Sequence, residues 1–211
     1  MKTIKIAVIG GTGKSGKYLV QQLLQKGYSI RLLLRNPEHF EIKSPLIEIV
    51  KGDARDYESV FLALQNCDCV LSMLGQPKGE SSIFSTATSH IIKAMQQLGL
   101  PRYIVTTGLN VNTEIDSKSE KVQIATNWMY EHYPETTNDK QKEYEILSKS
   151  ELNWTMVRLP LIRQTNDSFP YQTSLTDCSG DFISATDLAD FVIREMQEGH
   201  FIKKAPFLYN F

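Results

Sequence analysis

The sequence predicts an α/β fold, a doubly wound and mostly parallel sheet with helices on both faces. Short apolar stretches alternate along the whole chain with stretches of helical spacing, which is the pattern of repeated strand and helix units. Residues 70–74 are almost continuously apolar, as expected for a strand that helices cover on both sides. No repeat, low-complexity segment or linker divides the 211 residues. We therefore expect a single domain over residues 1–211.

The expected strands are short segments with few polar residues. The first one, residues 4–9, comes directly after Met1-Lys2-Thr3, which we expect to lead into the strand and not to begin a signal peptide. The remaining strands are expected at residues 29–34, 46–50, 70–74, 103–105 and 154–158, followed by shorter ones at 182–183 and 205–209.

Helical spacing of apolar residues follows most of these strands. Helices are expected over residues 18–24, 60–64, 82–98, 140–150 and 187–196. Gly99 and Pro101 mark the end of the third helix, as a C-cap and a helix stop. Residues 110–138 are polar, and we expect a helical excursion there beside the cleft, with the aromatic residues Trp128, Tyr130 and Tyr133.

A glycine-rich segment joins the first strand to the first helix. Strand, glycine turn and helix in this order are typical of a Rossmann-type dinucleotide site, in which the pyrophosphate lies on the helix N-terminus. Glycine permits the turn, the close approach of backbone amides to the phosphates, and tight packing of the helix on the strand. The expected cofactor contacts are Gly10, Thr12, Gly13, Lys14, Ser15 and Gly16.

An ATP or GTP loop is disfavoured at the same segment. The motif G-x-x-x-x-G-K-[ST] would place its last residues at Gly13-Lys14-Ser15. Its first glycine would then be residue 8, where the chain has Val8 inside a strand. A dinucleotide is therefore the expected ligand.

The residue after the second strand bears on which dinucleotide binds. Sites that prefer NAD usually carry an acid there for the ribose 2′-hydroxyl, but this chain has Arg35 and no acid before Glu38. A guanidinium can bind a 2′-phosphate through two parallel charged hydrogen bonds. We therefore expect NADP, although Arg35 is also compatible with a solvated arginine before the turn at Pro37.

Composition excludes several other classes of partner. The net charge is −1, so neither nucleic acid nor an anionic membrane is an expected partner, and no apolar run reaches membrane-spanning length. The three cysteines and four histidines show no metal-ligand spacing, so we expect no metal and reduced thiols. We expect a cytoplasmic monomer or weak homodimer that acts on a small-molecule acceptor.

Several motifs together resemble the atypical short-chain dehydrogenase/reductases. They are the glycine turn, Arg35, Gly52-Asp53 after the third strand, the segment Leu152-x-Trp154-Thr155-x-Val157-Arg158-x-Pro160, and Ile183-Ser184-Ala185-Thr186-Asp187-Leu188-Ala189. Among these enzymes the chain most resembles the NmrA-like group and the flavin reductases of the biliverdin reductase B type. The resemblance covers nearly the whole chain and is weakest from about residue 110 to 138. It implies a smaller, substrate-side portion from about residue 159 to 211.

The resemblance also implies further site residues. Asp53 would bind the adenine amino group, Ala54 would contact the ring, and Thr107, at the end of the fifth strand, would be the catalytic residue. The other implied cofactor contacts are Leu74, Gly75, Thr106 and Pro160. From the residues alone, Gly52-Asp53 is also compatible with a turn that carries a capping aspartate, and β-branched residues at a strand end need no function.

One departure from the resemblance limits the expected chemistry. Carbonyl reductases of this kind use Tyr-x3-Lys, in which the lysine lowers the pKa of the tyrosine so that the phenol can exchange a proton. None of the nine tyrosines has a lysine four residues later, and Tyr144 is followed there by Ser148. If Glu145 is aligned with the glutamate of that helix, the two positions fall on Thr137 and Gln141. The sequence therefore shows no evident proton donor.

Two functions remain compatible with this departure. Hydride transfer to a flavin, a quinone or a similar conjugated acceptor needs mainly positioning, because the acceptor ring spreads the incoming charge. The alternative is a non-catalytic NADP-sensing regulatory protein of the NmrA-like kind. A sugar-nucleotide epimerase is disfavoured, because that chemistry needs the missing tyrosine.

Overall fold

The computed structural model describes residues 4–211, so the expected lead from Met1-Lys2-Thr3 into the first strand lies outside the described residues. Six parallel strands form the main part of the sheet, and their apolar side chains fill both of its faces. They are β1 (Lys5–Ile9), β2 (Ser29–Leu34), β3 (Ile47–Lys51), β4 (Cys69–Ser72), β5 (Arg102–Gly108) and β6 (Asn153–Leu159).

Four short strands near the C-terminus extend this sheet. They are β7 (Leu161–Arg163), β8 (Tyr171–Ser174), β9 (Phe182–Ser184) and β10 (Phe207–Asn210). Over the described residues the order is β3-β2-β1-β4-β5-β6-β10-β9-β7, with β8 paired to β10. From β1 to β3 each new strand is added on one side of the sheet, and from β4 to β6 each is added on the other side. The boundary between β1 and β4 is therefore the switch point of a Rossmann sheet. The predicted fold class is confirmed.

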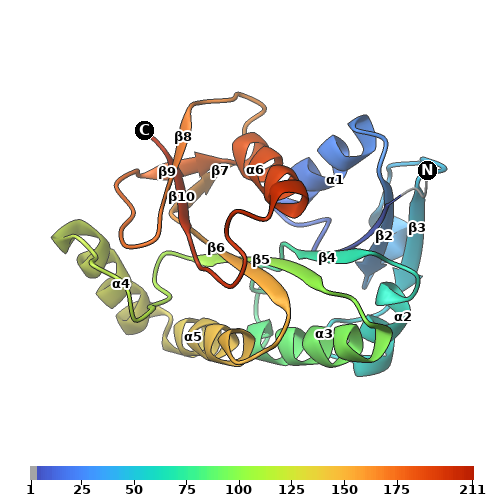
Figure 1. Cartoon of the computed structure of the whole chain (residues 1–211), viewed down its shortest axis with the longest axis horizontal. Coiled ribbons are helices and arrows are strands. Elements are labelled where there is room, and N and C mark those ends of the chain that lie inside the picture. The colour runs from blue at the N-terminus through green and yellow to red at the C-terminus, as the bar shows by residue number, and fades with distance from the viewer. Residues whose placement is uncertain (1–3) are drawn as a thin grey trace.

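Helices cover both faces of the sheet (Figure 1). On one face lie α1 (Gly16–Gln25) and α6 (Ala185–Glu198), which pack against each other. The other face carries α2 (Tyr57–Leu64), α3 (Phe84–Leu98) and α5 (Pro134–Ser148), while α4 (Glu120–His132) packs on α5 and a short 3₁₀ turn, η1, spans Pro37–His39. Each face buries its own large apolar cluster.

Most predicted elements are present, with shifted ends. The predicted Gly99 C-cap is confirmed, because that residue has a left-handed backbone with φ of 69°. The helix expected over about 140–150 ends at Ser148, close to its expected end, but its expected start is wrong, since α5 begins at Pro134, a residue suited to a first helical turn. Strands β7 and β8 were not expected, because three or four half-exposed residues carry too little apolar pattern.

A buried arginine joins the C-terminal strands to the loop before α4. The Arg158 side chain is fully buried and donates to both carboxylate oxygens of Asp116, at 2.7 and 2.8 Å. It also donates to the carbonyl oxygens of Val111, Leu175 and Ala205. Every partner of this buried charge lies outside β6, so the interaction fixes how residues 109–118 and the C-terminal segment surround the sheet.

Replacing Asp116 by Ala should lower the free energy of unfolding by about 3–5 kcal/mol, because it leaves the buried Arg158 charge without its counter-ion. Urea denaturation would measure the loss. Asp181→Ala, which breaks an exposed ion pair with Lys121, is the matched control and should change stability little. Equal effects of the two substitutions would show that the Arg158 interaction does not anchor the fold.

Candidate functional site

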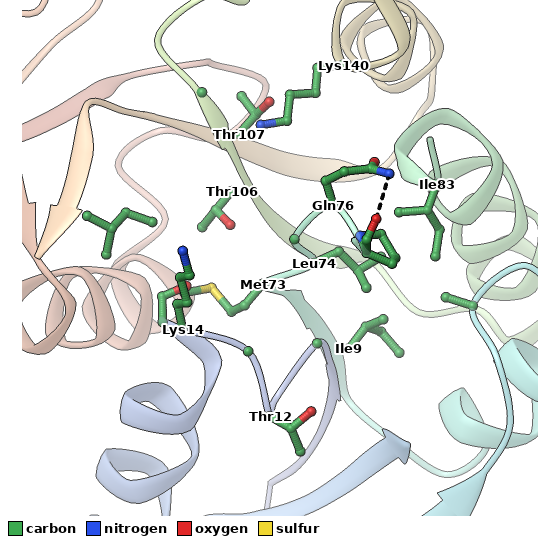
Figure 2. A pocket seen from close by; sticks show the side chains of 18 of the residues that line it. Ile9, Thr12, Lys14, Met73, Leu74, Gln76, Ile83, Thr106, Thr107 and Lys140 are labelled. Carbon is green, nitrogen blue, oxygen red and sulfur yellow. Dashed lines mark hydrogen bonds between the residues drawn. The ribbon is translucent and has the colours of Figure 1, made fainter. Parts of the chain in front are cut away.

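A cleft of about 1140 Å³ opens at the carboxyl ends of the parallel strands. Its walls come from the segments that follow β1, β2, β3, β4, β5 and β6. Figure 2 shows Thr12 at one end of this cleft, and Thr106, Thr107 and Lys140 at the other. The cleft thus lies at the switch point, the usual ligand position in an open α/β sheet.

The glycine turn forms the floor of the cleft. Gly10 has φ of 76°, and a Cβ there would come within 2.7 Å of the backbone of Met73, so this position requires glycine. A Cβ at Gly16 would overlap the Gly10 carbonyl, which means that α1 begins against the turn itself. At Gly13 the nearest atom is 3.3 Å away, so a side chain there would project mainly toward the cleft.

The N-terminus of α1 is suited to a phosphate group. Within residues 4–211 no side chain caps this helix end, and the residues that precede it, Lys14 and Ser15, line the cleft. A helix N-terminus carries a partial positive charge and unpaired N–H groups, which bind anions. Lys14, exposed at the same edge, adds a full positive charge.

Next to the glycine turn, Arg35 and Asp53 line the cleft, and they form ion pairs with Arg55 and Glu80, which lie outside the cleft lining. Glu80 bridges two arginines, with 2.8 Å from its Oε1 to Arg35 Nη1 and 3.0 Å from its Oε2 to Arg55 Nη1. Asp53 lies 4.0 Å from Arg35 and 3.9 Å from Arg55. The hydrogen bond from Arg35 to Glu80 raises the pKa of Arg35 further above its usual value.

The structure separates two roles that the sequence left open for Asp53. The residue that caps α2 is Asp56, whose carboxylate accepts from the Ser59 backbone amide at 2.9 Å. Asp53 instead accepts from the Arg55 amide and lines the cleft next to Ala54. The aspartate expected near the adenine is therefore not needed as the helix cap.

At the other end of the cleft, polar groups from β5 and α5 lie together. Thr107 Oγ1 is buried and has no hydrogen-bond partner among residues 4–211, while Thr106 Oγ1 lies 3.5 Å from the Ser72 carbonyl oxygen. Lys140 reaches toward the same strand end, because a Cβ at Gly108 would lie 3.6 Å from Lys140 Nζ (Figure 2). Burial lowers the pKa of this lysine.

A buried polar group lies one helical turn after Lys140. Glu143 Oε1 accepts a 2.7 Å hydrogen bond from Thr88 Oγ1, which is 3.1 Å from the Tyr103 hydroxyl. Burial raises the pKa of Glu143 to about 7, although the Thr88 hydrogen bond and the Lys140 charge act in the opposite direction. The pKa of this carboxyl group, which lies behind the cleft, is therefore close to neutral pH.

Apolar side chains complete this end of the cleft. Trp128 and Tyr133, 47% and 53% exposed, lie edge to face with ring centroids 5.7 Å apart. Met129, Leu161 and Ile162 line the same end. A flat, largely apolar partner would fit against such aromatic faces.

The predicted site residues converge on this one cleft, with a single exception. Gly16, the first residue of α1, is buried and does not line the cleft. The others do line it, namely Gly10, Thr12, Gly13, Lys14, Ser15, Arg35, Asp53, Ala54, Leu74, Gly75, Thr106, Thr107 and Pro160. Their individual roles toward a cofactor stay predictions.

Sequence reasoning missed Lys140, whereas it expected Trp128 and Tyr133, which form the aromatic wall, beside the cleft. The residues aligned with the tyrosine and lysine positions have structural partners instead, since Thr137 donates to the Met129 carbonyl oxygen and Gln141 bonds the Asn112 backbone. Tyr144 packs edge to face on Trp154, away from the cleft lining. No spacing rule distinguishes Lys140 from its neighbour Lys142, because only the packing of α5 decides which lysine faces inward.

A family model described as NAD(P)H-binding matches residues 10–198. The chain belongs to this NAD(P)H-binding family. The match covers most of the chain and includes the glycine turn, the cleft and α6. The predicted resemblance to the atypical short-chain dehydrogenase/reductases is confirmed, and so is the expectation of a nicotinamide dinucleotide as ligand, without distinction between NAD and NADP.

Individual relatives are more distant. An isoflavone reductase homologue from Nicotiana tabacum is 33% identical over 104 residues, or 45% of this chain, and the chain covers only 32% of that protein's length. A short-chain dehydrogenase/reductase from Veillonella parvula in complex with NADP superposes with a TM-score of 0.84 at 15% identity, covering 99% of this chain and 95% of that one. A protein described as an anaerobillin reductase, from Escherichia coli O157:H7, superposes with a TM-score of 0.74 at 17% identity, covering 98% of this chain and 97% of that one. At these identities the two structures show a shared fold.

Two further properties concern the described part of the chain. No helix within residues 4–211 is both long and apolar enough to cross a membrane. In the same residues, no three or more histidine, cysteine or acidic side chains gather as a metal site would require. The three cysteines are buried and form no disulfide.

Gly13→Val should abolish dinucleotide binding and leave the chain folded. The new side chain would occupy the space through which phosphates approach the backbone amides, while its Cβ, 3.3 Å from the Gly10 carbonyl oxygen, would need only a small backbone shift. Fluorescence titration with NADPH and a thermal melt would measure both properties. The smaller Gly13→Ala should lose less affinity. A folded Val variant with wild-type affinity would place the nucleotide elsewhere.

Glu143→Gln should flatten the pH dependence of stability. A carboxyl group whose pKa rises from 4.5 to about 7 on folding contributes stability that is complete below the lower value. This contribution is lost as the pH rises through about 7. Urea denaturation between about pH 5 and pH 8 should show a smaller fall for the variant than for wild type. Glu145→Gln, on the exposed side of α5, is the control, and parallel curves for all three proteins would contradict the assignment.

Proposed function

We propose that this chain is an NADPH-dependent reductase that transfers hydride to a planar conjugated acceptor, such as a flavin or a quinone. The observation that carries the proposal is that one cleft has two different ends. One end has the glycine turn, a helix N-terminus and Arg35, and the other has apolar and aromatic side chains around Lys140. A dinucleotide and an acceptor ring can be bound side by side in such a cleft.

The residues present fit a nicotinamide dinucleotide on two structural grounds. Gly10 and Gly13 keep the floor of the cleft clear of side chains, so that backbone amides can approach a pyrophosphate. At the opposite end, the buried hydroxyl of Thr107 has no partner within residues 4–211 and is available to a polar group of the ligand. When bound, NADPH would supply a hydride, which is two electrons and a hydrogen nucleus.

The chain's own residues would contribute position and charge. Trp128, Met129 and Tyr133 would hold the flat face of the acceptor and exclude water from it. Reduction of a quinone or a flavin leaves negative charge on the acceptor, and the Lys140 ammonium lies where it can stabilise that charge. Lys140 can also deliver the proton that completes the reduction, because burial lowers its pKa.

Arg35 supports NADP as the preferred dinucleotide. It lines the cleft next to Asp53 and Ala54, and it is within 2.8 Å of the carboxylate of Glu80, so its guanidinium already binds an anion there. The relative from Veillonella parvula was crystallised with NADP, and two relatives have reductase names. These likenesses are consistent with the proposal.

The alternative is an NADP-sensing protein without catalytic activity. One observation favours it: Ile115, in the loop before α4, and Ile124, within α4, are 58% and 61% exposed. A partner protein could cover such a surface. The two functions differ in turnover, so a screen of NADPH oxidation with FMN, FAD and simple quinones separates them. Acceptor-dependent oxidation well above the protein-free rate supports the reductase, and its absence supports the sensor.

Arg35→Ala should weaken NADPH binding by roughly ten- to a hundredfold and leave NADH binding nearly unchanged. Losing a hydrogen bond between charged groups costs on the order of 1.5–3 kcal/mol, and only NADPH carries the 2′-phosphate. Isothermal titration of both dinucleotides would test this. The preference for NADP is refuted if wild type binds NADH as tightly as NADPH.

Tyr144→Phe should keep NADPH-dependent flavin or quinone reduction within roughly tenfold of wild type, because this hydroxyl does not line the cleft.

Lys140→Met should lower kcat by about ten- to a hundredfold, the effect of one lost charged hydrogen bond. Lys142→Met, on the exposed side of the same helix, is the control. A thousandfold fall for Tyr144→Phe with NADPH affinity intact would restore a tyrosine acid and overturn the mechanism.

A further inference from the structure

We infer that Arg35 and Arg55 form a joint site for the 2′-phosphate of NADP, and that the Glu80 carboxylate occupies this site until the cofactor displaces it. The inference rests on the proposed use of NADP and adds a second cationic residue and a competing anion. It starts from one geometric fact: the two oxygens of Glu80 are divided between the two guanidinium groups.

The convergence of the two arginines follows from the sheet. Strands β2 and β3 pair in parallel, with Leu34 opposite Lys51, so their carboxyl ends lie at the same edge. Arg35 follows β2 directly, and Arg55 lies in the loop after β3. Glu80 comes from the loop after β4 and has to pass the end of β1 to reach them.

The charges in this cluster balance only while Glu80 is present. Arg35 and Arg55 face Asp53 and Glu80, which gives two positive and two negative groups within 4.0 Å of a partner. A phosphate monoester carries about −1.5 to −2 charges and three acceptor oxygens. It therefore offers the arginines more than one carboxylate does, and Glu80 would become a third anion that has to leave.

Glu80 can leave by rotation of its side chain. Its carboxylate is 40% exposed, so water can solvate it once it is released. The loop itself is held from within, because Gln76 Nε2 donates to the carbonyl oxygens of Glu80 and Pro77 at 2.8 and 3.1 Å. Arg55 Nη2 also donates to the Ser81 carbonyl oxygen at 2.6 Å. The backbone of the loop can thus stay in place while the anion is exchanged.

This arrangement affects the two dinucleotides differently. Binding of a 2′-phosphate breaks both ion pairs of Glu80, whereas a 2′-hydroxyl leaves them intact. Arg55 should therefore raise the affinity for 2′-phosphorylated ligands only, and Glu80 should lower it. A purely structural ion-pair cluster would change neither affinity in this selective way.

The test compares adenosine 2′,5′-bisphosphate with 5′-ADP, measured by isothermal titration on the full chain. Neither probe carries a nicotinamide, so the result does not depend on reductase activity. Arg55→Ala should weaken the 2′,5′-bisphosphate about tenfold, while Arg55→Lys should retain part of the affinity. Glu80→Gln should tighten the same probe about two- to tenfold. The affinity for 5′-ADP should stay nearly constant in all three variants.

Lys78→Ala and Glu58→Gln, both exposed, change the net charge by the same amounts and should leave the two affinities unchanged. Equal binding of the 2′,5′-bisphosphate by wild type, Arg55→Ala and Glu80→Gln would overturn the inference, even in a chain that reduces flavins with NADPH. Tighter binding of both probes by Glu80→Gln would also overturn it. The expected pattern in a chain that reduces no acceptor would support the inference and reject only the proposed reductase.

Discussion

The site depends on one close approach of backbone to backbone. Gly10 lies between the start of α1, where a Cβ on Gly16 would overlap its carbonyl, and the end of β4, where its own Cβ would meet Met73. Helix, turn and two strands can come this close only without side chains. The same contact aims the N-terminus of α1 at the cleft and sets the distance from the glycine turn to β4 and β5. Every other group of the site is positioned relative to it.

Buried charged groups of the scaffold and a buried polar group at the cleft differ in whether they have partners among the described residues. Arg158 and Arg102 are buried, and each has a carboxylate partner at 2.7 Å together with backbone carbonyl groups, so they hold segments together. At the cleft, the buried Thr107 hydroxyl has no hydrogen-bond partner within residues 4–211. Buried polar groups without partners are costly in free energy. The Thr107 hydroxyl lines the cleft together with Lys140, where a ligand could satisfy it.

The two ends of the cleft imply different kinds of selectivity. The end with Arg35 and Arg55 would recognise its ligand through charged hydrogen bonds, and such contacts discriminate strongly because a missing partner leaves a charge unpaired. The end with Trp128 and Tyr133 offers flat apolar surface that is half exposed. Apolar pockets discriminate weakly between ligands of similar shape. A selective cofactor site next to a tolerant acceptor site is the outcome that this geometry favours.

The sequence by itself determined the order of the six parallel strands and their helices, the glycine turn and the residues at the carboxyl ends of those strands, but not β7 and β8. These features are local: apolar runs, glycines and the residue after a strand keep their meaning without the rest of the chain. Only the tertiary structure decided that Lys140 faces inward while Tyr144 packs on Trp154, and that Glu80 bridges two arginines. Helix α5 is polar over most of its length, so its buried side is set by the elements it packs on and not by an apolar stripe. Contacts between loops of distant strands leave no spacing in the sequence, because the sheet order brings them together.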